Sequence, residues 1–194
     1  AITLYPFLYV VATAFSSSHA ITTGQVILWP VEFNIRNFKE LLGDGRIFIW
    51  TRNSAHVTLV AAALTLVATT IAAYALSKKR LRGRNFLLLA ITFTMLFSGG
   101  SIPSFILIKN LKLMNTYWSF WLPGLISTYY MFVMKTSFES MPASLEESAA
   151  LDGANDLTIL FRVVLPLQMP MLASLTLFFA VGAWNSYQPI LFYI

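Results

Sequence analysis

The chain of 194 residues is 57% hydrophobic and only 11% charged, and its mean hydropathy is +0.70. These values exclude an ordinary soluble globular domain and indicate a membrane protein. The net charge of +5 does not indicate a nucleic-acid-binding protein, because five of the 13 basic residues lie in one short loop instead of along a solvated face. The sequence contains no cysteine, which excludes disulfides and thiolate metal sites.

Long apolar runs separate the clusters of charged residues. A run of about 20 such residues can cross a hydrocarbon core of about 30 Å as a helix. We therefore predict membrane spans near residues 54–76, 86–108, 115–134 and 167–190. Residues 1–15 are also apolar and are expected to be the remainder of a further span. The apolar C-terminal residues lead us to expect one more span beyond them.

The connections between these runs set the predicted orientation. Residues 77–85 carry five basic residues and no acid, and short basic loops stay in the cytoplasm. We therefore expect residues 16–53 to form an external loop and residues 135–166 a cytoplasmic insert. The external loop has four basic residues between Arg36 and Arg52. These residues suit docking of a binding protein or electrostatic steering of an anionic saccharide. An ordinary solvated loop is the alternative.

The second predicted span contains Gly99, Gly100 and Pro103, which can break a helix. Broken backbone at membrane depth is tolerated where it lines a water-filled cavity or is buried in protein. Gly99 and Gly100 are therefore candidates for a substrate pathway, and a packing kink at a small-residue contact is an equal alternative. In the third span, Ser127 and Tyr130 are weaker candidates for contact with a polar solute.

The insert at residues 135–166 begins with a helix signal. Ser144 and Glu147 have the spacing of a capping box, which predicts a helix that starts at Leu145. Acidic residues in its first turns suit the positive end of the helix dipole. Gly153 can adopt the left-handed conformation that ends such a helix.

A second helix is expected to follow this turn. Asn155 or Asp156 can cap it, and its apolar residues recur at i, i+3, i+4 and i+7, which predicts a single apolar face. These residues are Leu157, Leu160, Phe161 and Val164. Pro166 then marks the passage into the next span. The predicted product is a helix, a glycine turn and a helix at the membrane surface.

The last predicted span ends in aromatic and amide residues, among them Trp184, Asn185 and Tyr187. Sugar recognition pairs aromatic faces with amide and hydroxyl groups, so these three residues are candidates for the substrate pathway. An aromatic girdle at the membrane interface has the same composition and is the alternative.

The sequence predicts a transport subunit without catalytic residues. It contains no Gly-x-x-x-x-Gly-Lys-Ser/Thr phosphate loop, and neither His19 nor His56 belongs to a cluster with metal-ligand spacing. No metal site is therefore expected. A secondary carrier driven by an ion gradient is the alternative to a passive translocation subunit. Such carriers usually bury ionisable residues at mid-membrane, and the middles of the predicted spans have none.

Residues 147–166 read E-S-A-x3-G-x9-V-x-L-P, which resembles the EAA motif of ATP-binding-cassette (ABC) importer permeases. Serine and valine replace the usual alanine and isoleucine at two positions, and both replacements are small or isosteric. The resemblance implies that the insert is a coupling loop that sits in a cleft of a cytoplasmic ATPase subunit. The residues it assigns to coupling are Glu146, Glu147, Ala149, Asp152, Gly153, Ala154, Leu165 and Pro166.

The resemblance extends to the carbohydrate-uptake branch, and in particular to the second permease of maltose-type systems, through Pro142, residues 103–117 and Trp184-Asn185. Residues 95–104 and 115–118 resemble the subgroup that imports acidic oligosaccharides such as alginate or pectin-derived uronides. The implied fold is an all-α polytopic membrane protein, the transmembrane domain of a type I ABC importer. About six transmembrane helices are expected in the full protein, about five of them in this chain, with a cytoplasmic helix-turn-helix insert.

The resemblance also implies partners in a bacterial plasma membrane. Residues 1–194 would form a single permease domain that works beside a second permease subunit, identical or different. Two copies of an ATPase subunit would carry the ATP and Mg²⁺, so this chain would hold no cofactor. An external solute-binding protein would deliver the saccharide. An ABC permease for a non-sugar solute is the alternative within this class.

Overall fold

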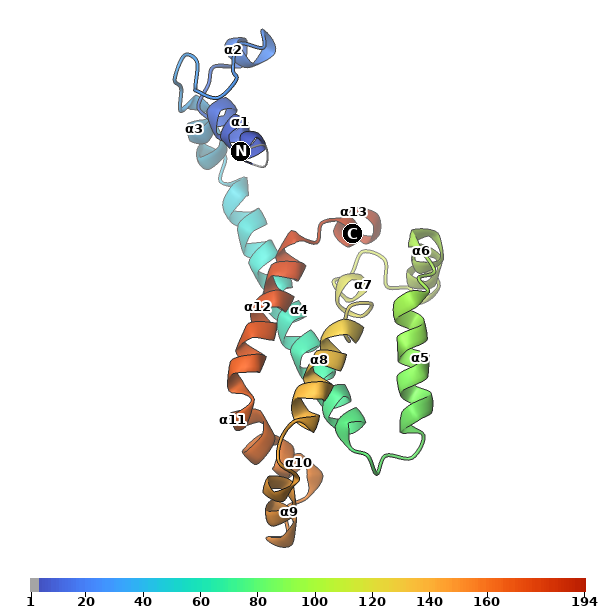
Figure 1. Ribbon diagram of the computed structural model, residues 1–194. Coiled ribbons are helices and arrows are strands. Elements are labelled where there is room, and N and C mark those ends of the chain that lie inside the picture. The colour runs from blue at the N-terminus through green and yellow to red at the C-terminus, as the bar shows by residue number, and fades with distance from the viewer. Residues whose placement is uncertain (1–3) are drawn as a thin grey trace. The chain divides into compact units, whose positions relative to one another are not determined.

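The computed structural model describes residues 4–194, and every regular element in that range is a helix (Figure 1). The all-α expectation is confirmed for these residues. The chain divides after Asn53 into two compact units, which are described in turn.

The first unit contains three short helices, α1 (Tyr5–Ala14), α2 (Ser18–Thr22) and α3 (Arg36–Gly43). Its small core is formed by Ala12, Ala20 and Val26. The apolar helix α1 corresponds to the predicted remainder of a span at residues 1–15, of which the first three lie outside the described residues.

The helix α4 (Arg46–Ser77) begins after Gly45, whose φ is +70°, and continues through the first predicted span. Among the described residues it is the one helix that is by itself long and apolar enough to cross a membrane. The predicted span 54–76 lies entirely within it. The helix also includes eight preceding residues, 46–53, which we had expected to lie in the external loop.

The second predicted span is a broken pair of helices, α5 (Arg84–Leu96) and α6 (Ser101–Asn110), which are bent by 116°. Gly100 lies at the break with a φ of +84°, a conformation that side chains other than glycine rarely adopt. The predicted helix break at this glycine pair is therefore confirmed. Its function as part of a substrate pathway stays a prediction.

The third predicted span, residues 115–134, does not form one helix. A short helix α7 (Trp118–Trp121) is followed by irregular backbone that contains Pro123 and Gly124, and α8 runs from Thr128 to Glu139. Proline and glycine both disfavour helix interiors, which explains the interruption. Two hydrogen bonds hold this segment against α4: Thr65 Oγ1 donates to the Gly124 carbonyl at 3.0 Å, and the Ser127 amide donates to Thr69 Oγ1 at 3.2 Å.

The C-terminal part contains six helical segments. They are α9 (Ala143–Leu151), α10 (Asp156–Ile159), the π-helical segment η1 (Leu160–Val164), α11 (Leu165–Leu167), α12 (Met169–Asn185) and α13 (Gln188–Tyr193). The segment Asp156–Leu167 is bent by 86° from α12, and the predicted span 167–190 ends as a helix at Asn185. Within residues 4–194, one helix can cross a membrane, or up to three spans form if each bent pair counts as one. The expected number of about five spans stays a prediction.

The core of the second unit lies where α4, α8, η1 and α12 meet (Figure 1). Met131 and Met134 of α8 and Val164 of η1 are completely buried there. In contrast, no residue of α5 is buried, and Phe86 at its start is 73% exposed. An exposed apolar surface of this kind suits contact with the hydrocarbon chains of lipids.

Candidate functional site

The insert begins with α9, which starts at Ala143 and not at Leu145 as predicted. Pro142 stands at the N-cap position with a φ of −58°, and its carbonyl accepts the first hydrogen bond from the Leu145 amide at 3.2 Å. Proline fixes φ near the helical value and favours helix starts. Ser144 therefore lies inside the first turn, where no side-chain cap forms, and the predicted capping box is wrong.

The predicted left-handed turn at Gly153 is confirmed, with a φ of +84°. The Gly153 amide donates to the Ala150 carbonyl and the Ala154 amide donates to the Ala149 carbonyl, both at 3.0 Å. These two bonds form a Schellman motif, which satisfies carbonyls that the end of a helix leaves without partners. The turn therefore fixes the direction in which the chain leaves α9.

Asn155 caps the second helix of the insert, because its Oδ1 accepts from the Thr158 amide at 2.8 Å. The predicted single apolar face is only half correct: Leu160 and Val164 are buried, but Leu157 and Phe161 are about 60% exposed. The wider π-helical turns of η1 alter the spacing on which that face was predicted. A proline at position 166 has no amide to donate to the Arg162 carbonyl, which explains why regular α-helix hydrogen bonding is lost here.

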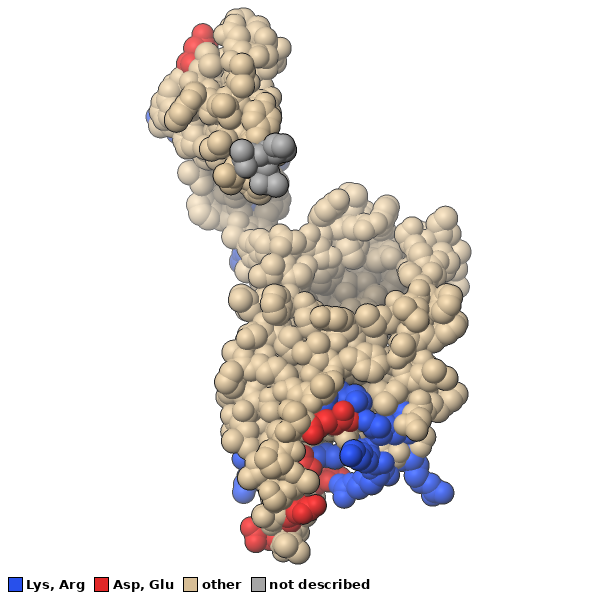
Figure 2. Space-filling view, viewed as in Figure 1, with Lys and Arg blue, Asp and Glu red and all other residues tan. Residues whose placement is uncertain are grey.

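The acidic residues of the insert pair with the basic loop between α4 and α5. Lys78 pairs with Glu146 of α9, and Arg80 pairs with Asp156 of α10. Figure 2 shows the red and blue side chains meeting at the end of the molecule that carries α9. The expectation that residues 77–85 and the insert share one side of the membrane is thus supported by direct contacts.

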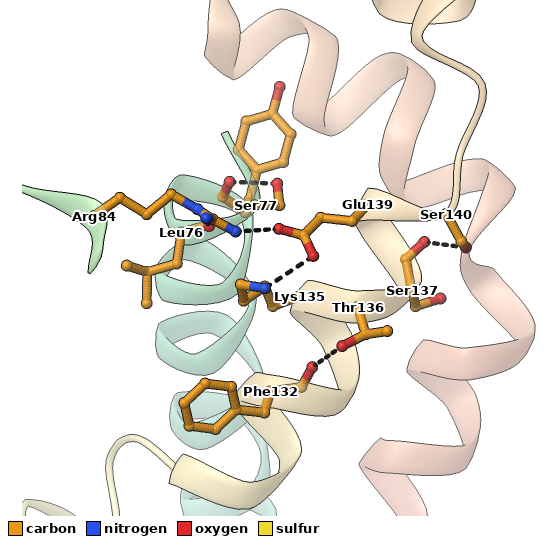
Figure 3. Close-up of polar contacts among 10 residues, drawn as sticks. Leu76, Ser77, Arg84, Phe132, Lys135, Thr136, Ser137, Glu139 and Ser140 are labelled. Atoms are coloured by element: carbon orange, nitrogen blue, oxygen red, sulfur yellow. Dashed lines mark hydrogen bonds and ion pairs between the residues drawn. The ribbon is translucent and has the colours of Figure 1, made fainter. Parts of the chain in front are cut away.

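Arg84 joins three helices at the same end of the unit (Figure 3). Its Nε donates to the Leu76 carbonyl near the end of α4 at 2.8 Å, and its terminal nitrogen pairs with Glu139 at the end of α8. Glu139 also accepts from Lys135 Nζ at 2.8 Å. These three charged side chains are between 11 and 27% exposed. The junction therefore ties α4, α5 and α8 together in a partly desolvated setting.

The charge state of Glu139 follows from this geometry. Burial by itself raises the pKa of the Glu139 carboxyl group, but the hydrogen bonds and charges of Lys135 and Arg84 together outweigh that effect. The net result is a pKa below the ordinary value of 4.5. The carboxylate is therefore ionised at neutral pH and balances the two cations beside it.

The residues that the resemblance assigned to coupling fall into two groups. Glu146, Ala149, Ala154 and Leu165 are partly buried against the rest of the unit. The other four are exposed and are available to another protein: Glu147, Asp152, Gly153 and Pro166. The insert thus has one side that faces its own chain and one side that faces outward.

A second candidate site is a cavity of about 550 Å³ among α4, α6, α7, α8, α12 and the residues around α13. Figure 2 shows the surface hollowed at the level of α7 and α13. Hydroxyl groups and aromatic rings line this cavity, and no charged side chain of the described residues does. The hydroxyl-bearing lining residues are Thr65, Ser104, Ser119, Ser127, Tyr130, Ser186 and Tyr193.

The cavity brings together only two of the predicted pathway residues, Ser127 and Tyr130. The Tyr130 ring stacks on Phe178 with a centroid distance of 5.8 Å and meets Phe179 edge-on at 5.3 Å, so α12 holds it in place. The remaining five candidates do not line the cavity: Gly99, Gly100, Trp184, Asn185 and Tyr187.

The side chains at the end of α12 lie elsewhere. Asn185 donates from Nδ2 to the Val181 carbonyl at 3.0 Å, which uses its amide within its own helix. Trp184 and Tyr187 are 53 and 76% exposed. The neighbouring residues that line the cavity are Gly182, Ala183, Ser186 and Pro189.

Sequence reasoning missed the polar contacts made by Lys78, Arg80, Arg84 and Glu139. From the sequence, the basic loop is explained by membrane orientation alone. The sequence nevertheless contained a signal for these contacts. Residues 135–166 contain five acidic residues, the basic loop contains five basic residues, and both segments are predicted to lie on the same side of the membrane. Two loops of opposite charge at one membrane surface are expected to attract each other.

Known proteins are similar to this chain along most of its length. Residues 65–194 match the family described as "Binding-protein-dependent transport system inner membrane component". The polygalacturonan/rhamnogalacturonan transport system permease protein YtcP of Bacillus subtilis (strain 168) is 37% identical over 193 residues, which cover 100% of this chain and 68% of that protein. Protein LplC of the same organism is 37% identical over 194 residues, covering 100% of this chain and 66% of that protein.

A solved structure is also similar. It is the crystal structure of a bacterial ABC transporter involved in the import of the acidic polysaccharide alginate, and one of its chains matches with a TM-score of 0.80 and 37% identity over 95% of this chain and 66% of that one. The similarity in sequence and in fold identifies a helical membrane permease subunit. The chain belongs to the family of binding-protein-dependent transport system inner membrane components. It spans about two thirds of the length of the relatives cited.

Proposed function

We propose that this chain is a translocation subunit of an ATP-driven importer that takes up oligosaccharides, and acidic ones in particular. The observation that carries the proposal is the similarity in both fold and sequence to a chain of the alginate importer, with 37% identity over 95% of this chain. The chain would form half of the pathway beside a second permease subunit. ATP and Mg²⁺ would be held by two copies of a cytoplasmic ATPase subunit.

In this proposal the insert is the docking surface for one ATPase copy. Its outward side presents Glu147 and Asp152 next to the exposed turn at Gly153, and Leu151 is 89% exposed. An acidic rim around an exposed leucine suits a partner cleft with an apolar floor and basic edges. The loop with five basic residues favours a cytoplasmic position for the end of the second unit that carries the insert.

The proposed solute is recognised by ring stacking and hydroxyl groups in the cavity that contains Ser127 and Tyr130. The lining is aromatic and hydroxyl-rich, which suits the faces and hydroxyl groups of a sugar. Because the described lining residues carry no charge, this chain supplies no counter-charge for a uronate there. We therefore infer that selection for acidic sugars depends on the external binding protein, which delivers the solute, or on the second permease.

The test is a reconstitution in proteoliposomes of the chain in its full-length form with its permease partner, ATPase and binding protein. ATP hydrolysis is measured with uronic-acid oligomers, neutral maltooligosaccharides and amino acids. We expect uronic-acid oligomers to stimulate hydrolysis most. Stimulation by neutral sugars alone would contradict the acidic specificity, and stimulation by amino acids alone would contradict the sugar specificity.

The same vesicles distinguish the importer from a carrier driven by an ion gradient. Uptake of labelled solute is expected to require ATP on the side of the membrane that carries the ATPase. It is expected to persist when ionophores collapse the proton and sodium gradients. Uptake that follows the ion gradient and ignores ATP would contradict the proposal.

A further inference from the structure

The coupling helix α9 is the part of the insert least anchored by packing. None of its residues is buried, whereas the following segment contributes Ile159, Leu160 and Val164 to the core of the second unit. Ala149 and Ala154 make only partial apolar contact with that core. Apolar packing therefore fixes the second half of the insert and leaves α9 weakly held.

A polar contact compensates for this weak packing. Lys78 pairs with Glu146, and the two side chains are 17 and 26% exposed, so water screens the pair only in part. The Lys78 ammonium also lies over the Tyr74 ring of α4, 4.1 Å from its centroid. A cation held by a carboxylate and an aromatic face loses side-chain freedom and gains a defined position.

The loop and the insert line a shared hollow of about 550 Å³. The charged residues that line it are Lys78, Lys79 and Arg80 from the loop and Glu146, Glu147 and Asp156 from the insert. Leu81 of the loop packs in part against the apolar cluster that contains Ile159 and Leu160 of the insert. The shielded Lys78–Glu146 pair adds a polar contact to this small apolar one.

The loop also holds the ends of the helices beside it. Arg84, the first residue of α5, binds the Leu76 carbonyl of α4 and the Glu139 carboxylate of α8. A force applied to α9 would reach Lys78 through Glu146. Because Lys78 follows the last residue of α4 directly, the force would pass into the junction of α4, α5 and α8.

We infer that the Lys78–Glu146 pair, together with the contacts of Arg84, is an electrostatic clasp that carries movement of α9 into the transmembrane helices, with Lys78 as the positioning residue for Glu146. This inference rests on the proposed function, in which a partner ATPase moves α9. It gives the basic loop a mechanical role in addition to its part in membrane orientation.

The first test is charge reversal in the reconstituted complex. Lys78→Glu and Glu146→Lys are each expected to lower the amount of solute transported per ATP hydrolysed by about threefold or more, because each places like charges in contact. The double variant restores an opposite-charge pair and is expected to recover most of the loss. A double variant no better than the worse single variant would contradict the clasp.

The matched control is the exposed pair Arg80 and Asp156, whose side chains are 70 and 58% exposed. Exposed ion pairs contribute little and are screened by salt. Arg80→Glu and Asp156→Arg are therefore expected to change transport per ATP by less than about twofold. An effect as large as that at Lys78 and Glu146 would indicate a general charge effect and overturn the specific role of that pair.

The second test uses the absence of native cysteine in the chain. In Lys78→Cys combined with Glu146→Cys, the ion pair is lost and low coupling is expected. A short, reducible cross-linker between the two thiols is then expected to restore coupling, and reduction is expected to remove it again. Cross-linking that stops ATP-driven transport would show that the contact must open during the cycle, which would overturn the clasp.

Failure of the two proposals can be told apart. If the unmodified complex performs no ATP-driven import, the proposed function fails whatever the variants do. The clasp then still predicts rapid cross-linking of the cysteine pair, because Lys78 and Glu146 are in contact. Slow cross-linking would contradict the clasp independently of transport.

Discussion

Gly153 shows how a single residue sets the geometry of the insert. Its φ of +84° is accessible to glycine at no steric cost, and a Cβ at this position would meet no atom within 4 Å. A substitution here therefore changes the backbone conformation without creating a clash. This separates the effect of turn geometry from the effect of packing.

We expect Gly153→Val to lower recovery of the copurified ATPase and to cost at least about 1–2 kcal/mol at the turn, because a β-branched residue disfavours the left-handed conformation. Gly153→Asn is expected to have a smaller effect, because asparagine tolerates this conformation. Gly43→Val serves as the control, since that glycine has no positive φ and equally open surroundings. Equal recovery with valine and with glycine at position 153 would argue against the role of the turn.

At the scale of elements, the ends of α4, α5 and α8 depend on one charged junction. Glu139 balances Lys135 and Arg84, and all three are mostly shielded from water. Because the pKa of Glu139 is lower in the folded chain than its ordinary value of 4.5, ionised Glu139 favours the folded state. That stabilisation is fully present above about pH 4.5 and is lost as the pH falls through the lower, folded-state pKa.

Glu139→Gln is therefore expected to lower the free energy of unfolding at pH 7 by about 1–3 kcal/mol, because two partly buried cations lose their counter-charge. The variant is also expected to lose less stability than the unmodified chain when the pH falls from 7 to 4. Thermal unfolding of the purified complex across this pH range measures both effects. Asp44→Asn, at an exposed pair with Arg46, is the control and is expected to leave the free energy of unfolding nearly unchanged. An unchanged acid dependence in Glu139→Gln would rule out this role for the carboxylate.

At the scale of the whole molecule, the ion pairs place the basic loop and the insert at one end of the second unit. The orientation of this end relative to the membrane is still a prediction from charge. Residues 1–194 contain no cysteine, so an introduced thiol is the single one in this part of the protein and reports its own side of the membrane.

Single cysteines that replace Lys79, Glu147 and Lys39 are expected to differ in the side of the membrane from which they are labelled. A membrane-impermeant maleimide should label Lys79→Cys and Glu147→Cys in inverted vesicles but not in intact cells. It should label Lys39→Cys in intact cells. Labelling of Lys79→Cys and Glu147→Cys from opposite sides would contradict the shared end, and labelling of both from outside would reverse the predicted orientation.

Several features of the fold were predictable because they depend on local sequence. Apolar composition predicted helices, the glycine pair at residues 99–100 predicted the break between α5 and α6, and Gly153 and Asn155 predicted a turn and a cap. Each of these effects acts within a few residues of chain. The capping box at Ser144 failed for a similar local reason, because Pro142 starts the helix earlier.

The remaining features depend on contacts between distant residues. The interruption before α8 is held by hydrogen bonds to α4 from residues about 58 positions away in sequence. The cavity residues come from six helices, so Ser127 and Tyr130 could be suggested as polar residues but not assembled with Ser104 or Tyr193. Lys78 and Glu146 are 68 residues apart, and no spacing rule connects them.

The absence of buried residues in α9 has a consequence for interchange between related transporters. Residues 142–153 form a cassette with no buried residue, and Ala149 is its one apolar side chain that packs in part against the core of the second unit. Exchanging this cassette for that of a relative would leave Leu160 and Val164 in place to hold the rest of the insert. Such a graft would change which ATPase the subunit accepts without repacking its interior, provided that an acid at position 146 and a glycine at position 153 are kept.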